Sequence, residues 1–170
     1  MTPDDAAREV SASRSPLRAA YLAVLRHPDA LRRHHGPGHL TASGLVLDPG
    51  GTAALLVLHR KVGLWLQPGG HVEDGDASLA AAAVREAEEE TGVRGLAADP
   101  VPLVLDRHPA PCGVEEHLDV QFLLRAAERT APGGSAESLE VRWWPVDGLP
   151  RQRVDLAPLV AAGVARLRGG

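Results

Sequence analysis

The chain has 170 residues, of which 44% are hydrophobic and 24% charged, and its formal net charge is −4 at pH 7. This composition suits one globular domain with a sizeable core, and the negative charge argues against a nucleic-acid or membrane surface as a partner. The single cysteine, Cys112, excludes a disulfide within the chain and suits a reducing compartment. Since no N-terminal segment resembles a signal peptide and no apolar run approaches the roughly 18 residues that span a bilayer, we expect a cytoplasmic protein.

The N-terminal part is expected to be helical. Residues 1–14 are polar and predict a frayed or loosely helical segment. A Ser-Pro pair at Ser15 resembles an N-cap with proline at the first helical position. The apolar residues after it repeat at helical spacing and predict a helix that ends before Pro28. We interpret residues 1–36 as an N-terminal helical extension and 37–170 as the principal domain.

Histidines are dense in the next segment, His34 to His39. Such a tract can bind a transition metal. A breaker loop with exposed histidines is the favoured interpretation, because no cysteine or fixed-spacing partner accompanies the tract. His108 and His117 are further candidates for a pocket, although spacing does not show whether they share one.

The principal domain alternates between strands and helices. Short apolar runs bounded by turn residues predict strands, and longer periodic segments predict helices. The expected strands are 40–47, 53–59, 101–105, 117–124 and 141–146, and the expected helices are 77–91 and 156–167. Segments 106–113 and 131–135 are rich in proline or glycine and are predicted loops.

The predicted helix 77–91 carries a cluster of acidic residues. At about 100° per residue, Glu86, Glu89 and Glu90 fall on one face of this helix, whereas Glu88 points to nearly the opposite side. Two such charges about 4 Å apart cost about 4 kcal/mol at an effective dielectric near 20. A hard divalent cation such as Mg²⁺, which favours carboxylate oxygens together with waters and phosphates, would relieve this repulsion. The alternative is a solvated acidic face.

The stretch from Gly69 to Val93 resembles the Nudix box, G-x5-E-x7-R-E-U-x-E-E-x-G-U, where U is a bulky aliphatic residue. The second half matches in register at Arg85, Glu86, Glu89, Glu90, Gly92 and Val93. The first half departs from the pattern, because Asp76 stands where the family has Glu and eight residues rather than seven separate it from Arg85. In the family that Glu braces the loop against the Arg, so the departure leaves open whether Asp76 pairs with Arg85.

The resemblance implies an α/β fold, a Nudix-type α/β/α sandwich with a mixed β-sheet between helices, here with an extra N-terminal helix, and it makes 37–170 the Nudix hydrolase domain. It implies Mg²⁺-dependent hydrolysis of a nucleoside diphosphate linked to another moiety: a nucleotide, sugar, alcohol or phosphate. Mg²⁺ is the expected cofactor, with Mn²⁺ as an alternative. The expected partner is a small-molecule nucleotide substrate, and a homodimer is left open.

The resemblance also assigns roles to residues of the box. Glu89 and Glu90 are the expected principal metal ligands, and Glu86 is a ligand or the general base. Arg85 is expected to orient the glutamates and the loop. The backbone carbonyl of Gly70 is a further expected contact of the site.

Other site residues are expected outside the pattern of the box. Arg60 is a candidate for a substrate phosphate, with a surface charge at a strand end as the alternative. His71 is a candidate acid, base or phosphate donor, with a hydrogen-bonded strand histidine as the alternative. The resemblance implies one further acidic metal ligand beyond the helix, where Glu116 ranks ahead of Glu115 and Asp119, with an ordinary surface charge as the favoured alternative for each.

Two rival functions remain. A Nudix-fold nucleotide-binding or regulatory module without hydrolysis would lose box glutamates, whereas Glu86, Glu89 and Glu90 are all present. An isomerase resembling isopentenyl diphosphate isomerase would need a catalytic cysteine, for which Cys112, in a proline-rich loop, is no convincing counterpart. The sequence does not choose the substrate, because specificity lies in loops outside the box.

Overall fold

A parallel pair of long strands forms the centre of the structure. The computed structural model describes residues 1–110, 112–136, 138–152 and 156–169. Within it, β1 (Gly38–Leu47) pairs in parallel with β7 (Glu116–Arg125) along the whole length of both strands. β1 is buried throughout, as its nearly continuous apolar upper half requires of a central strand.

The other strands pair antiparallel around this centre, so the sheet is mixed. On the β1 side lie β2 (Ala53–His59), β3 (Trp65–Leu66), β4 (Gly69–His71) and β8 (Ser138–Pro145); β2 and β4 both pair with β1, and β3 and β8 pair with β2. On the β7 side lie β5 (Ala97–Ala98) and β6 (Val104–Pro109). β1 therefore shares its edge between β2 at one end and β4 at the other.

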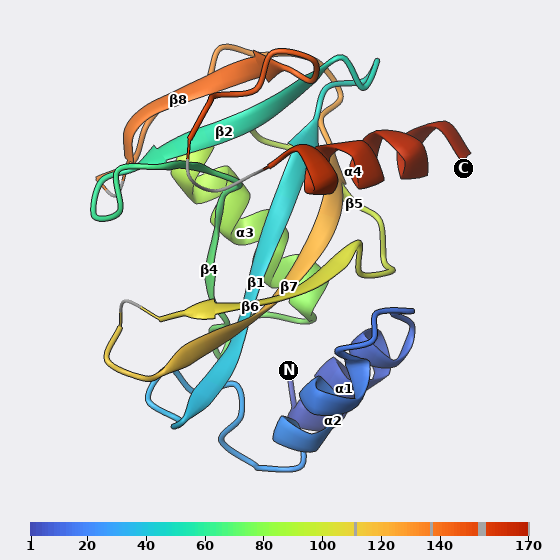
Figure 1. Ribbon diagram of the computed structural model, residues 1–170, viewed down its shortest axis with the longest axis vertical. Coiled ribbons are helices and arrows are strands. Elements are labelled where there is room, and N and C mark those ends of the chain that lie inside the picture. Colours follow the sequence, from blue (N-terminus) through green and yellow to red (C-terminus); the bar gives the residue numbers. More distant parts are fainter. Residues whose placement is uncertain (111, 137, 153–155, 170) are drawn as a thin grey trace.

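Helices cover both faces of the sheet (Figure 1). Successive side chains of a strand point to opposite faces, and β1 uses this alternation to serve two cores. Ala42 and Val46 belong to the core that includes α3 (Leu79–Thr91), whereas Leu45 and Leu47 belong to the core that includes α4 (Ala157–Gly169). The architecture is therefore an α/β/α sandwich with a mixed sheet, as expected.

The first N-terminal helix, α1 (Pro3–Ser11), has a capped N-terminus. The Thr2 hydroxyl accepts a hydrogen bond from the Asp5 N–H at 3.2 Å, and the Asp5 carboxylate accepts one from the Thr2 N–H at 2.8 Å. This reciprocal pair is a capping box. Of the two alternatives for residues 1–14, the helical one is therefore confirmed, because these polar residues cap the helix.

The second N-terminal helix, α2 (Arg18–Val24), begins later than the Ser-Pro pair indicated. The Ser15 hydroxyl accepts from the Leu17 N–H at 3.2 Å, in the turn that precedes the helix. Tyr21 is fully buried, and its hydroxyl donates to the backbone carbonyls of Asp106 in β6 and Asp119 in β7. The extension therefore shares the core of the sheet, because α1 and α2 pack in the same hydrophobic cluster as α3.

Some strand predictions need correction. The bounds of β2 are those expected, but β6 covers Val104–Pro109 and not 101–105. Residues 106–109, predicted as part of a loop, are strand because their partners in β7 impose the pairing. The apolar run that motivated the prediction contains Pro102, which has no N–H to donate to a ladder.

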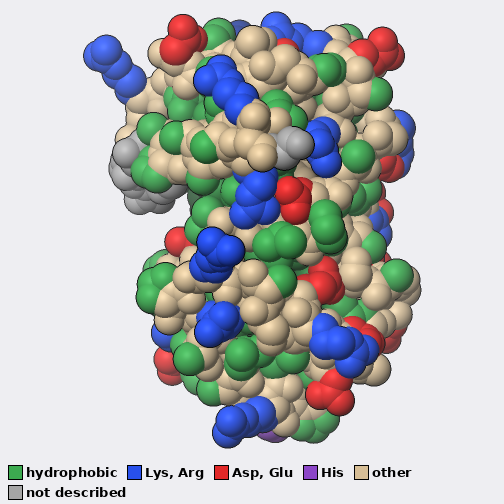
Figure 2. Space-filling model, turned by 90° about the vertical axis from the view of Figure 1, so that its right-hand side faces the viewer, with side chains coloured by type: hydrophobic (Ala, Val, Ile, Leu, Met, Phe, Trp, Pro, Cys, Tyr) green, Lys and Arg blue, Asp and Glu red, His purple; other side chains and the backbone are tan. Residues whose placement is uncertain are grey.

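The surface carries charges of both signs. On the face shown in Figure 2, Lys and Arg side chains are interspersed with Asp and Glu side chains. Among the described residues, no helix combines the length and apolarity needed to cross a bilayer.

Candidate active site

The acidic helix α3 begins at a cap built by two segments. The Ser78 hydroxyl accepts from the Ala81 N–H at 2.9 Å. The carboxylate of Glu9, from α1, accepts from the N–H groups of Leu79 at 2.8 Å and Ala80 at 3.1 Å. Because Ser78 is extended, with φ −159°, the helix starts at Leu79 and not at residue 77. The negative charge of Glu9 also interacts favourably with the positive, N-terminal end of the helix dipole.

The far end of α3 is held by the glutamate that points away from the acidic face. Gly92, with φ 69°, ends the helix in the left-handed conformation that glycine favours. The Glu88 carboxylate accepts from the N–H groups of Gly95 at 2.7 Å and Leu96 at 3.2 Å, and from Arg94 at 3.4 Å. Glu88 therefore lies off the acidic face, as expected, but it organises the following loop.

The acidic face of α3 lies against the glycine strand β4. The Gly69 N–H donates to the Glu90 carboxylate at 3.2 Å. A Cβ at Gly70 would lie 2.7 Å from the carboxylate atoms of Glu86. Glu90 is 7% exposed, and the Glu86 side chain is 16% exposed. A side chain at Gly70 would therefore displace the Glu86 carboxylate, and one at Gly69 would clash with Ser43 of the neighbouring strand.

The third glutamate of the face is more open. The Glu89 side chain is 56% exposed and accepts from Arg85 Nη1 at 3.3 Å, and the same nitrogen donates to Glu86 at 3.0 Å. Arg85 thus bridges the exposed Glu89 and the more buried Glu86, which lies against β4. The structure brings the three glutamates together along one side of the helix, as their spacing predicted.

Arg85 also answers the question left open about Asp76. Its Nε donates to Asp76 Oδ1 at 2.9 Å and its Nη2 to Asp76 Oδ2 at 3.0 Å. Nη2 donates in addition to the carbonyl of His71 at 2.9 Å. The shorter acid and the extra residue therefore preserve the brace between the loop, β4 and the helix.

The electrostatics of this edge favour a cation. Burial raises the pKa of Glu86, Arg85 opposes that rise, and Glu89 adds to it. One guanidinium faces the carboxylates of Asp76, Glu86 and Glu89, and Glu90 lies beside them. These oxygen donors, two of them confined between a helix and a glycine strand, fit a hard divalent cation such as Mg²⁺.

A shallow hollow lies beside this edge on the exposed side of α3. It has a volume of about 540 Å³ and reaches from Ser78 past Arg85 and Glu89 to Arg94. The Glu89 end of the acidic edge is therefore open to solvent, while the Glu90 end is closed by β4.

Two of the residues expected outside the box are engaged elsewhere. Arg60 donates from Nε to the carbonyl of Ala136 at 3.0 Å and from Nη2 to the carbonyl of Ser138 at 3.1 Å. Glu116 accepts from Arg107 Nε at 3.0 Å. These contacts give both side chains a structural partner, and their roles toward phosphate and metal stay predictions.

Asp119 is the acidic candidate whose strand position is nearest to β4. Thr41 of β1 pairs with His71 on one side and with Asp119 on the other. The Asp119 carboxylate is 3% exposed and accepts from Thr41 at 2.9 Å, Ser43 at 2.6 Å and Gln121 at 3.1 Å. It is a buried carboxylate whose hydrogen bonds tie β1 to β7.

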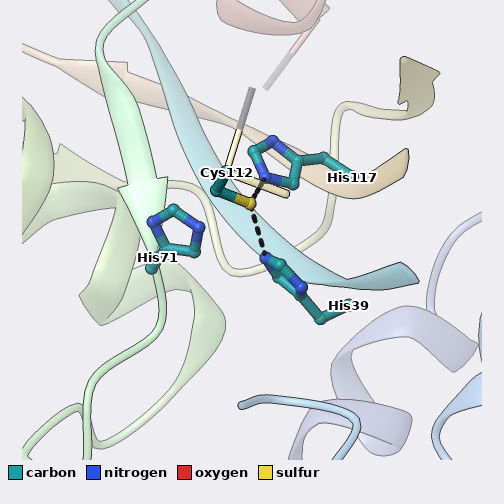
Figure 3. A group of neighbouring side chains, drawn as sticks. All are labelled: His39, His71, Cys112 and His117. Carbon is teal, nitrogen blue, oxygen red and sulfur yellow. Dashed lines mark hydrogen bonds between the residues drawn. The ribbon is translucent and has the colours of Figure 1, made fainter. Parts of the chain in front are cut away.

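His71 points away from the glutamates. Gly70 faces α3, so the next side chain along the strand faces the other side of the sheet. There His71 meets His39, His117 and Cys112 (Figure 3). Cys112 Sγ lies 3.2 Å from His117 Nε2 and 3.9 Å from His39 Nε2. Burial lowers the pKa of His71 to about 4 and that of His117 to about 3.

This cluster corrects the interpretation of the histidine tract. His34 is exposed, but His39 is fully buried, and Cys112 is close to it. Sequence reasoning missed the grouping, because it placed His39 in a loop and considered only His108 and His117 for a common pocket. The sequence pattern does not give the register in which β1, β4 and β7 pair, and this register brings the three histidines together.

An acidic helix packed on a glycine strand, within an α/β/α sandwich, is the architecture that the site presents. The model of the NUDIX domain matches residues 37–163, which is most of the chain. The chain therefore belongs to the Nudix family, and it is a Nudix hydrolase.

Solved structures share this fold. The Ap4A hydrolase of C. elegans, solved as a binary complex, is 19% identical, with a TM-score of 0.63 over 77% of this chain and 98% of that one. An ADP-ribose pyrophosphatase from Streptococcus suis is 22% identical, with a TM-score of 0.58 over 76% and 91%. The NUDIX domain of Shewanella oneidensis NrtR, complexed with ADP ribose, is 21% identical, with a TM-score of 0.57 over 77% and 88%.

Proposed function

We propose that this protein is a Mg²⁺-dependent pyrophosphohydrolase that cleaves a nucleoside diphosphate linked to another moiety. The observation that carries the proposal is the contact between the carboxylates of Glu86 and Glu90 and the Gly69–Gly70 strand. Buried carboxylates repel one another, and Arg85 offsets only part of this negative charge. A cation bound at the acidic side of α3 would lower the remaining repulsion. Mn²⁺ satisfies the same oxygen donors.

Glu86, Glu89 and Glu90 are the residues that would hold the metal. When bound, Mg²⁺ neutralises charge on the diphosphate and acidifies a coordinated water. We assign Glu86 as either a ligand or the base that takes the proton of the attacking water, and the rise of its pKa on burial supports the second role. Arg85 orients Glu86 and Glu89 and holds the loop through Asp76, so it is a positioning residue.

The proposed substrate class follows from the site and from the relatives. A nucleotide-linked diphosphate presents anionic oxygens to the metal and an ester or anhydride leaving group. Two of the similar structures are named for Ap4A and ADP-ribose hydrolysis, and a third holds ADP ribose. We extend to this chain only their shared chemistry, a nucleoside diphosphate joined to a second group.

The free thiol of Cys112 is in keeping with a reducing cytoplasm.

A product-release screen with Mg²⁺ tests this function. The purified chain is incubated with dinucleoside polyphosphates, ADP-ribose, nucleotide sugars, CDP-alcohols and nucleoside triphosphates, and the products are separated by chromatography. We expect one class to yield two phosphate-containing products, with ¹⁸O from labelled water in one of them. A nucleotide-binding module without hydrolysis would bind a member of the panel and release nothing. That result would overturn the proposal.

A further inference from the structure

Four side chains capable of binding a soft or borderline metal converge on the face of the sheet opposite the glutamates (Figure 3). They are His39, His71, Cys112 and His117, and one ligand atom from each lies within 4.8 Å of all the others. Three come from β1, β4 and β7, and Cys112 comes from the turn between β6 and β7. Residues so far apart in the chain share this point only because the strands are in register.

The register explains why the histidines meet. His39 of β1 pairs directly with His117 of β7, and Thr41, two residues further along β1, pairs with His71 of β4. Paired residues and residues two apart share one face of a sheet. The ring centroids are 5.0 Å apart for His39 and His117, 5.1 Å for His39 and His71, and 5.3 Å for His71 and His117.

The spacing of the ligand atoms suits a tetrahedral ion. With Zn–S near 2.3 Å and Zn–N near 2.0–2.1 Å, the edges of the tetrahedron are about 3.3–3.6 Å. The two distances from Cys112 Sγ, 3.2 Å to His117 and 3.9 Å to His39, lie on either side of this value. The widest separation, 4.8 Å, closes to this edge with a relative movement of about 1.2–1.5 Å, which rotation of side chains can supply.

The surroundings leave ligand atoms available. Among the described residues, His71 Nε2 is buried and has no hydrogen-bond partner, a costly state for a polar atom. His117 contacts the ring of His108, edge to face at 5.4 Å, and His108 in turn bonds Asp106 through Nδ1 at 2.9 Å. These groups pack against the outer side of His117 and restrict the orientation of its ring.

We propose that His39, His71, Cys112 and His117 form a tetrahedral Zn²⁺ site that is separate from the Mg²⁺ site and has a structural role. Three imidazoles and a thiolate select a transition ion over Mg²⁺. Four protein ligands leave no position for substrate, which is the pattern of structural zinc. Binding deprotonates the Cys112 thiol and releases that proton to solvent.

Zinc bound at this site would act on the active site through β4. The His71 side chain faces the proposed zinc and the His71 carbonyl accepts from Arg85, while the Gly69 N–H donates to Glu90 and Gly70 faces Glu86. Bound zinc would therefore connect β4, which contacts the glutamates, to β1, to β7 and to the turn that carries Cys112.

Metal titration of the stripped protein tests the proposal. The full chain is freed of metal with a chelator, then titrated with Co²⁺ and Zn²⁺ in excess Mg²⁺. We expect one ion per chain, the intense visible bands of tetrahedral Co²⁺, a thiolate charge-transfer band, and a rise in melting temperature with Zn²⁺. Octahedral Co²⁺ spectra or the absence of stoichiometric binding would overturn the site, and neither readout depends on a variant that could misfold.

Variants then identify the ligands. Cys112→Ser should abolish the thiolate band and weaken Zn²⁺ binding by more than the roughly 10–100-fold that loss of outer support costs, and His117→Ala should do the same to affinity. The matched control, His34→Ala, changes an exposed histidine of the tract and should leave both unchanged. Glu89→Gln should lose hydrolysis but retain Zn²⁺ binding, which separates this site from the proposed function. Zinc affinity unaffected by Cys112→Ser would refute the assignment.

Discussion

Arg85 and Asp76 form a two-pronged ion pair that joins the helix to the glycine loop, with Nε–Oδ1 at 2.9 Å and Nη2–Oδ2 at 3.0 Å. The Asp76 side chain is 5% exposed and that of Arg85 is 21% exposed. Burial raises the pKa of Asp76, but the hydrogen bonds from Arg85 and from the Glu73 N–H outweigh it and the net pKa is lowered. Asp76 is therefore a charged, buried partner of Arg85.

Asp76→Ala should destabilise the fold by about 3 kcal/mol, because it leaves a mostly buried guanidinium without its main partner. Chemical denaturation followed by circular dichroism measures this loss. The control is Asp74→Ala, which breaks the pair between Arg32 and Asp74, whose side chains are 53% and 83% exposed. It should cost less than about 1 kcal/mol. Equal losses in the two variants would contradict the brace.

Glu89→Gln and Glu90→Gln should each lower turnover on the order of 100-fold or more, because each removes a charge that positions the metal against the phosphates. Steady-state kinetics on the substrate found in the screen measure the effect. Glu88→Gln is the matched control on the same helix. Its amide oxygen can still accept from Gly95, so activity should be retained with a small loss of stability. Equal losses at Glu88 and Glu89 would show that the acidic face is misassigned.

Mg²⁺ should raise the melting temperature, because it binds the folded state and relieves repulsion among the glutamates. At tenfold excess over its dissociation constant the gain is about 1.4 kcal/mol, which corresponds to about 3–6 °C for a chain of this size. Differential scanning fluorimetry with a sodium chloride control at equal ionic strength measures it. A double variant, Glu89→Gln with Glu90→Gln, should lose most of the shift. An equal shift in that variant would place Mg²⁺ elsewhere.

Glu9→Ala should destabilise the protein by about 1 kcal/mol, the usual cost of losing a helix cap, because Leu79 and Ala80 lose their hydrogen-bond acceptor. Denaturant titration gives the value. Glu9→Gln keeps one acceptor oxygen but no charge, and an intermediate loss is expected from the weaker interaction with the helix dipole. If Glu9→Ala left the free energy of unfolding unchanged, solvent would cap α3 as well as Glu9 does.

Metal-free protein should lose stability as the pH falls below about 6.5. Burial lowers the pKa of His71 to about 4 and of His117 to about 3, and the nearby positive groups Arg33, His39 and His108 act in the same direction. Between those values and about 6.5 the unfolded chain binds more protons than the folded one, so acid favours unfolding. At pH 5 the loss is on the order of 1–2 kcal/mol per histidine.

Denaturation in chelator at pH 5 and pH 7.5 measures this loss. His117→Gln should show a smaller difference between the two pH values, because the variant no longer carries one of the two groups. The same pH dependence in wild type and variant would assign the effect to carboxylates instead.

Local spacing was enough to predict the acidic edge. Glu86, Glu89 and Glu90 are neighbours on any helix, because positions three and four apart always share a face. The bounds of β2 were predictable for a similar reason, since a short apolar run between turns is itself the signal of a buried strand. The resemblance of residues 69–93 to the Nudix box added the fold and the class of chemistry.

Contacts between elements depended on strand register and helix docking, which no local pattern encodes. Whether Asp76 reaches Arg85 depended on how the loop folds back, and the cap from Glu9 required α1 to dock at the start of α3. The bounds of β6 followed from its pairing with β7, and the meeting of Cys112 with three histidines required β1, β4 and β7 in one alignment. A side chain's neighbours along the chain follow from dihedral geometry, whereas its neighbours across a sheet follow from packing of the whole domain.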